Sequence, residues 1–257
     1  MTDNEYEQLI KNVSTVFNAA ASVKHYGSYK YFYETNVETV KNLIEFCKKA
    51  DAKLIHTSTL SVSGNSFGDE FDGYISETEK HFYESSLYIE QPLENVYARS
   101  KFEAEKTILE EMANGLKANI MRMGNLTNRF SDAKFQKNHE SNAFLNRLRA
   151  VLNLGIFPEY LMDLYLEFTP IDDAASAVMT IARNFSTEQT VFHIIAPMIR
   201  GRLSVMATED EQYQQKEFEY VIKSNPECNL FITPAKLKQF IYNREVFSLF
   251  DQKYFDL

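Results

Sequence analysis

Basic residues, cysteines and long apolar runs are scarce in this 257-residue sequence, and each scarcity excludes a class of protein. The formal net charge of −9 disfavours nucleic acid and anionic membranes as partners, because both select a basic surface. No stretch approaches the roughly 18 consecutive apolar residues of a membrane-spanning helix, and the acidic start Met1–Glu5 is unlike a signal peptide. Only Cys47 and Cys228 are present, so two free thiols in a reducing cytoplasm are favoured over a disulfide.

Motifs for metal binding and for hydrolysis are also absent from the sequence. The five histidines show no metal-binding spacing with cysteines or carboxylates, so no metal site is predicted. His56 lies in a predicted strand and fits a buried core residue better than a catalytic base. Ser61 and Ser63 are not surrounded by the Gly-x-Ser-x-Gly turn of a hydrolase nucleophile. Arg122, near a strand end, is compatible either with a cofactor phosphate or with an acidic neighbour.

Apolar and β-branched runs alternate with helical patterns along most of the chain. Strands are predicted at residues 14–18, 53–59, 118–123 and 191–196. Helices are predicted at residues 29–49, 95–114, 141–153 and 172–184, and the last sixty residues are mostly helical by pattern. This alternation predicts an α/β fold with a parallel sheet and right-handed crossovers. The long polar segment 61–94 is typical of a functional loop, often a lid.

Tyr97 and Lys101 form the pair of residues that suggests catalysis. They lie four positions apart on a predicted helix, so both side chains leave the same face. A lysine beside a phenol favours the phenolate and should lower the phenol pKa from its ordinary value of about 10. Such a phenol can donate a proton to an oxygen that gains charge during hydride transfer. Thr59 ends the preceding strand, where catalytic groups of parallel sheets gather, and is predicted to bond the same oxygen.

A second Tyr-x-x-x-Lys pair, Tyr26 and Lys30, shows that the spacing alone is weak, since the chain has 15 tyrosines. Tyr26 has no strand end before it, so it is predicted to pack or to face solvent. The position of Tyr97 after a strand end is therefore what separates the two pairs.

Five short motifs occur in the order found in extended short-chain dehydrogenases/reductases, which this sequence resembles. They are Asn18–Ala21, Asn36–Thr39, His56–Val62, Tyr97–Lys101 and Phe168–Asp173. Within that superfamily the chain is most similar to the terminal thioester reductase domains of nonribosomal peptide synthetases, relatives of carboxylic acid and fatty acyl reductases. The narrower likeness is carried by Asn95–Glu105, Arg122–Leu126 and Phe192–Ile194. It covers most of residues 10–200 and fades after about residue 200.

The resemblance implies a role for each matching residue. Thr59 and Tyr97 would polarise the substrate carbonyl, and Lys101 would tune Tyr97 and hold the nicotinamide ribose. Asn36 would fix the sheet and helix near the active site. The full set of residues expected at the cofactor, which would be NADPH, is Ala19, Ala20, Asn36, Tyr97, Lys101, Gly124 and Asn125.

The resemblance also implies a domain plan and a reaction. Residues 1–128 would form a partial Rossmann-type parallel sheet that lacks its first βαβ unit. Residues 129–257 would form a smaller, mainly helical substrate domain, with 172–196 returning to the Rossmann core. The reaction would release a carrier-bound acyl or peptidyl thioester, held on a phosphopantetheine arm, as an aldehyde or an alcohol. Two alternatives stay open: a reductase or epimerase acting on a nucleotide sugar or ketone, and a non-catalytic module.

One feature of dinucleotide-binding folds is missing. Such folds hold the pyrophosphate at a helix N-terminus that follows a glycine-rich turn, and no Gly-x-x-Gly-x-x-Gly occurs here. Gly64 and Gly68 come after a later strand and fit a flexible loop. We therefore expect a chain truncated at its amino end, in which strand 14–18 is an exposed sheet edge. We also expect it to bind NADPH poorly by itself and to be inactive alone.

Overall fold

The computed structural model of the protein describes residues 2–24, 27–64, 82–132, 134, 165–167, 169–195 and 200–202. The chain forms two compact units. The first contains Met1–Met123 and Val178–Ile194, and the second contains Gly124–Ala177 and Ile195–Leu257. The predicted helix 141–153, most of the segment 61–94 and nearly all of the last sixty residues lie outside the described residues.

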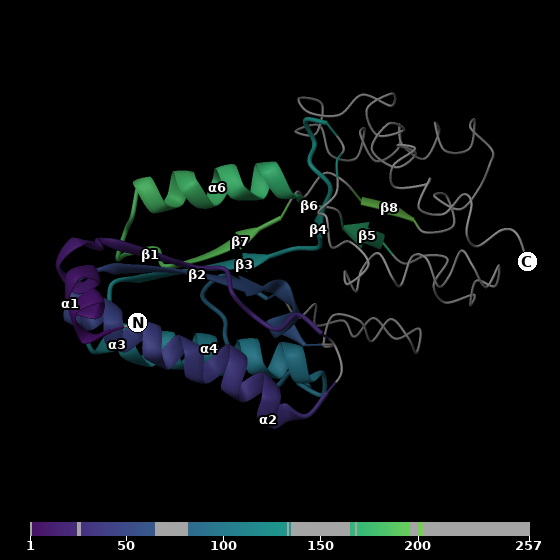
Figure 1. The fold of residues 1–257 in the computed structure, drawn as a ribbon. Coiled ribbons are helices and arrows are strands. Elements are labelled where there is room, and N and C mark those ends of the chain that lie inside the picture. The colour runs from purple at the N-terminus through teal and green to yellow at the C-terminus, as the bar shows by residue number, and fades with distance from the viewer. Residues whose placement is uncertain are drawn as a thin grey trace, which may run out of the picture. The chain divides into compact units, whose positions relative to one another are not determined.

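The first unit is built on a parallel sheet of four described strands in the order β1-β2-β3-β7 (Figure 1). The strands are β1 (Thr15–Asn18), β2 (Lys53–Thr59), β3 (Ala118–Met123) and β7 (Val191–Ile194). Every residue of β3 is buried, as expected for a central strand covered on both faces. Among the described strands β1 pairs only with β2, and its Phe17 is 48% exposed.

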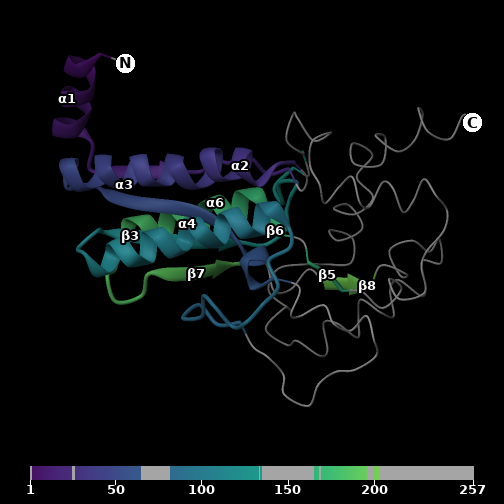
Figure 2. The same cartoon turned by 90° about the horizontal axis from the view of Figure 1, so that it is seen from below.

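The helices of the first unit lie on the two faces of this sheet (Figures 1 and 2). They are α1 (Asp3–Asn12), α2 (Tyr29–Phe32), the π-helical turn η1 (Tyr33–Glu38), α3 (Thr39–Ala50), the 3₁₀ turn η2 (Leu60–Ser63) and α4 (Val96–Ala113). Figure 1 shows α3 and α4 on one face, with α6 (Ile171–Arg183), whose C-terminal half belongs to this unit, on the other. The sheet is therefore covered in the three-layer manner of an α/β fold.

The core between the helices and the sheet follows from the spacing of apolar residues. Val40, Ile44 and Cys47 recur at helical intervals on α3 and are all buried. They belong to one buried cluster with Leu54 of β2 and Ile108 of α4. Helix α3 ends where Asp51 adopts the left-handed conformation, with φ 51°, and the chain turns directly into β2.

The second unit contributes two small described sheets. In one, β4 (Leu126–Thr127) pairs in parallel with β6 (Thr169–Pro170). In the other, β5 (Tyr165–Glu167) pairs in antiparallel fashion with β8 (Arg200–Arg202). The carboxylate of Asp172, at the start of α6, accepts hydrogen bonds from the backbone N–H groups of Phe130 and Ser131. Burial raises the pKa of this carboxyl, and the two backbone donors more than offset that by lowering it.

The predicted α/β class with a parallel sheet is confirmed, and two local features differ from the sequence prediction. The predicted helix 29–49 is continuous in outline but contains the π turn η1, which carries Asn36. Helix α1 was not predicted at all. Its Thr2 and Glu5 form a capping box, in which Glu5 N–H donates to the Thr2 hydroxyl and Thr2 N–H donates to the Glu5 carboxylate.

Candidate active site

Thr59 and Tyr97 meet where β2 ends and α4 begins. Asn95 caps α4, its side-chain oxygen accepting from the N–H groups of Tyr97 at 2.9 Å and Ala98 at 3.1 Å. This cap places Tyr97 in the first turn, where its phenol is hydrogen-bonded to the Thr59 side chain. The Thr59 hydroxyl also accepts from the N–H of Ser61 at 3.2 Å, which fixes its position at the strand end.

Lys101 lies one turn after Tyr97 and reaches the same strand. Its ammonium donates to the carbonyl oxygen of Thr57 at 2.8 Å, two residues before Thr59. The three residues predicted to carry the chemistry therefore converge at the carboxyl end of β2. Lys101 is only 4% exposed. Burial lowers its pKa to about 8, and the carboxylate of Glu105 offsets part of that shift.

The predicted lowering of the Tyr97 pKa is wrong. Burial raises the pKa of the phenol, because the phenolate loses its contact with water, and the hydrogen bond with Thr59 offsets only part of this effect. The ammonium of Lys101 is engaged by the carbonyl of Thr57. Tyr97 is therefore held as a neutral phenol, the form that donates a proton.

Asn36 connects the segment after β1 to the helix that carries Tyr97. Its side-chain oxygen accepts from the N–H of Ser22 at 2.7 Å, and its NH₂ group donates to the Ser22 carbonyl at 3.1 Å. The same NH₂ group donates to the Ser100 hydroxyl at 2.9 Å, and that hydroxyl donates to the Tyr97 carbonyl at 2.8 Å. Asn36 belongs to the π turn η1, a conformation often found at functional sites. This geometry fits the predicted role of Asn36 in holding sheet and helix together.

Asn18, the last residue of β1, and His56, in the middle of β2, form a buried pair. The Asn18 Nδ2 lies 3.0 Å from His56 Nδ1, so this amide donates and His56 carries its proton on Nε2. The Asn18 oxygen accepts from the N–H of Ala20, which shapes the turn containing the exposed Ala19 and Ala20. Burial, followed by the charge of Lys101, lowers the His56 pKa well below its ordinary value. His56 is thus a neutral core residue, as expected, although its Nε2 has no partner among the described residues.

Gly124 and Asn125, the last two predicted cofactor residues, follow β3 directly and belong to the second unit. The Asn125 carbonyl accepts from the N–H of Thr169 at 2.8 Å, which joins the chain next to β4 and β6. Their place beside the nicotinamide stays a prediction.

Sequence analysis missed the partner of Arg122. The guanidinium of Arg122 is 0% exposed and binds the carboxylate of Glu105 through Nε at 3.0 Å and through a terminal nitrogen at 2.8 Å. Glu105, also 0% exposed, accepts a further hydrogen bond from the Ser58 hydroxyl. Of the two readings of Arg122, the acidic neighbour is confirmed. The Lys-x-x-x-Glu spacing of Lys101 and Glu105 was visible in the sequence, but the partner of Glu105 on β3 was not.

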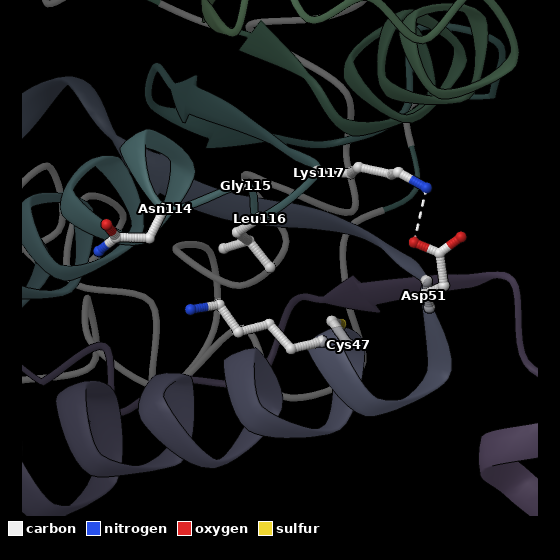
Figure 3. Close-up of a pocket in the computed structure, with 8 residues that line it drawn as sticks. Cys47, Asp51, Asn114, Gly115, Leu116 and Lys117 are labelled. Atoms are coloured by element: carbon white, nitrogen blue, oxygen red, sulfur yellow. Dashed lines mark hydrogen bonds and ion pairs between the residues drawn. The ribbon is translucent and has the colours of Figure 1, made fainter.

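A pocket of about 190 Å³ lies at the opposite end of the sheet, near the amino ends of β2 and β3 (Figure 3). Its lining residues are Cys47, Lys48, Asp51, Ala52, Asn114, Gly115, Leu116 and Lys117. Burial raises the pKa of the Cys47 thiol to about 11, so this cysteine is an unreactive packing residue. The pocket is remote from Thr59, at the other end of β2, and takes no part in the candidate site.

The described part of the chain contains neither a metal-binding cluster nor a membrane-spanning helix. Within those residues no group of three or more potential metal ligands occurs. No helix among them combines the length and apolar character that crossing a membrane requires.

Comparisons with known proteins identify the family to which this chain belongs. A family model described as Male sterility protein, an NAD-binding family, matches residues 1–178. Two fungal proteins are each 25% identical: glycine betaine reductase ATRR of Emericella nidulans over 201 residues, and the PKS-NRPS hybrid synthetase acdB of Aspergillus candidus over 184 residues. These matches cover 77% and 71% of this chain, which spans only 15% and 7% of the lengths of those proteins.

Solved structures of reductase domains are also similar to this chain. A thiolation-reductase di-domain from an archaeal non-ribosomal peptide synthetase is 28% identical, with a TM-score of 0.73. That comparison covers 96% of this chain and 72% of that structure. The reductase domain of the aureusimine biosynthetic cluster is 21% identical with a TM-score of 0.69, covering 94% of this chain and 70% of that structure, and it shows the fold alone. The family match over more than half of the sequence and the Rossmann-like sheet together establish that this chain belongs to the NAD-binding family described as Male sterility protein, within the extended short-chain dehydrogenases/reductases.

Proposed function

We propose that this protein takes part in the NADPH-dependent reductive release of an acyl or peptidyl thioester from a carrier protein. The product would be an aldehyde or, after a second reduction, an alcohol. The observation that carries the proposal is the hydrogen-bonded pair of Thr59 and Tyr97 at the end of β2, with the buried ammonium of Lys101 on the carbonyl of Thr57 in the same strand. Each of these side chains carries one hydroxyl hydrogen, and both would turn to donate to a carbonyl oxygen bound between them.

Each residue has a task that follows from its environment. The thioester carbonyl oxygen would accept hydrogen bonds from Thr59 and Tyr97, whose donors are preorganised at the end of β2. As charge develops on that oxygen, the neutral phenol of Tyr97 donates its proton. Lys101, held by the Thr57 carbonyl, supplies a positive charge beside the phenolate that remains.

The described residues fit the nicotinamide side of NADPH better than its phosphate side. The ammonium of Lys101, which bonds the Thr57 carbonyl two residues before Thr59, would donate to the nicotinamide ribose hydroxyls. The exposed Ala19 and Ala20 would line the cofactor beside its adenosine. When bound, NADPH would supply the hydride. The sequence contains no glycine-rich turn for the pyrophosphate, so we expect the 257-residue chain to hold the cofactor weakly.

A carrier-bound substrate is supported by the named relatives. The archaeal structure with 28% identity pairs a reductase with a thiolation domain, the part of a synthetase that carries the acyl chain. The fungal synthetase match points to the same setting. By analogy, the partner proposed for this chain is a peptidyl carrier protein whose phosphopantetheine arm presents the thioester.

The test uses the full-length protein with saturating NADPH and an acyl thioester of pantetheine. We expect an aldehyde, trapped as its hydrazone, in step with NADPH oxidation. Tyr97→Phe should reduce the rate by about 10²- to 10⁴-fold, because it removes the proton donor but keeps the ring.

The control is Tyr31→Phe, the same chemical change at a largely exposed tyrosine away from the site, which should leave the rate unchanged. Equal loss in both variants, or no reduced product from a protein shown to have NADPH bound, would contradict the proposal.

A further inference from the structure

Glu105, which forms a buried ion pair with Arg122, lies one helical turn after the proposed catalytic lysine. Glu105 follows Lys101 by four residues on α4, so both side chains leave the same face of the helix. Both residues are buried, and the ion pair joins α4 to β3. The Ser58 hydroxyl that donates to Glu105 comes from β2, next to the Thr57 carbonyl that holds Lys101.

The hydrogen bonds of Arg122 fix the position of its guanidinium. One terminal nitrogen donates to the Ser86 carbonyl at 2.7 Å, and the other lies 3.3 Å from the Tyr83 carbonyl and from His193 Nε2. The guanidinium also stacks on the ring of Phe82, 4.6 Å from its centroid. These contacts hold the guanidinium against the Glu105 carboxylate, so the two charges of the pair stay close together.

Charged and titratable groups lie near Lys101 on α4, β2 and β3, while Tyr33 and Glu38 of the π turn η1 bond Lys41 instead. On α4 they are Tyr97 and Glu105. On β2 His56 is neutral, and on β3 Arg122 faces Glu105 rather than Lys101. Glu105 is thus the source of negative charge for Lys101 among these groups, and Arg122 is bound to that same carboxylate.

We propose that Glu105 and Arg122 act as positioning residues that balance the charge of Lys101. Glu105 favours the protonated ammonium, and Arg122 limits how strongly it does so. This inference rests on the proposed function only because that function gives Lys101 a task. The balance would keep the ammonium charged near neutral pH without forming a direct ion pair that would draw it away from Tyr97 and the Thr57 carbonyl.

The test is an NMR titration of the lysine side chains in the 257-residue chain labelled with ¹³C-lysine, with the Lys101 signal identified by its loss in Lys101→Met. Glu105→Gln should move the Lys101 titration to lower pH, and Arg122→Met should move it to higher pH, each by on the order of one unit. The double variant should titrate between Glu105→Gln and the parent. Shifts of the Lys101 titration in opposite directions indicate charge coupling, because a loss of packing would not shift the titration in opposite directions in the two variants.

The matched control is Glu110→Gln, on the same helix but exposed and paired with Lys106, which should leave Lys101 unmoved. Shifts of the same sign in both single variants, or none, would overturn the inference. If a single variant fails to fold, the double variant decides, since a titration at or above the parent value contradicts the proposal. The titration needs neither cofactor nor thioester, so an inactive protein with the expected shifts would refute only the proposed function.

Discussion

The lysines at the two ends of the parallel sheet lie in opposite environments. At the amino end Lys117 pairs with Asp51 (Figure 3). Lys48 pairs with Glu111, and all four side chains remain partly exposed. At the carboxyl end Lys101 is buried and donates to a neutral carbonyl. Surface pairs of the first kind contribute little to stability, whereas a buried ammonium lowers it. The buried Lys101 thus costs stability at the carboxyl end, as expected for a group that serves the proposed chemistry.

Among substitutions at the two ends of the sheet, Lys101→Met should change the free energy of unfolding most. Burial holds the Lys101 pKa at about 8, below its ordinary 10.5, so the unfolded chain binds this proton more readily than the folded one. The stability cost of burying the charged Lys101 is therefore complete below pH 8, and it disappears as the pH rises from 8 to 10.5. Lys101→Met removes this cost, so it should raise the unfolding free energy above that of the parent at pH 7. At pH 10.5 the gain over the parent should be smaller by roughly 3 kcal/mol. Urea unfolding at the two pH values measures this, and a difference that does not change with pH would contradict it.

Asn36→Ala should produce the next largest effect, at the same end of the sheet. It removes the buried amide that bonds Ser22 and Ser100, and the backbone groups of Ser22 lose their partner. We expect a loss of about 2 kcal/mol in unfolding free energy, and a lower reduction rate because α4 is less firmly held. Denaturant unfolding measures the first effect. The control is Asn114→Ala at the amino end, whose side chain makes one exposed hydrogen bond and should cost far less.

The contrast between the two ends also explains which features could be predicted from the sequence. Strands β2 and β3 have the predicted bounds, because each is an apolar, β-branched run with a turn at its end. The convergence of Thr59 and Tyr97 followed from a general rule for parallel sheets. The Tyr97 pKa was predicted in the wrong direction because burial, a tertiary property that the sequence does not show, raises the pKa more than the hydrogen bond with Thr59 lowers it.

Other features depended on contacts between distant elements. The π turn around Asn36 contains residues that form ordinary helix, and its partners are 14 and 64 residues away in sequence. The Glu105–Arg122 pair joins a helix to a strand, and neither residue has a local pattern that identifies its partner. Helix α1 differs from these, since the Thr2–Glu5 capping box was present in the sequence and should have predicted it.

The smallest effect should come from Lys117→Ala at the amino end. Lys117 is 2.6 Å from the carboxylate of Asp51, but both side chains are substantially exposed, so water and salt screen their attraction. The change in unfolding free energy should be within about 0.5 kcal/mol. The reduction rate should not change, because Lys117 precedes β3 at the end of the sheet remote from Thr59. Urea unfolding at low and high salt, beside Asn36→Ala, measures the contrast. A loss as large as that of Asn36→Ala would mean that the amino end also depends on its charges, and the distinction between the two ends would fail.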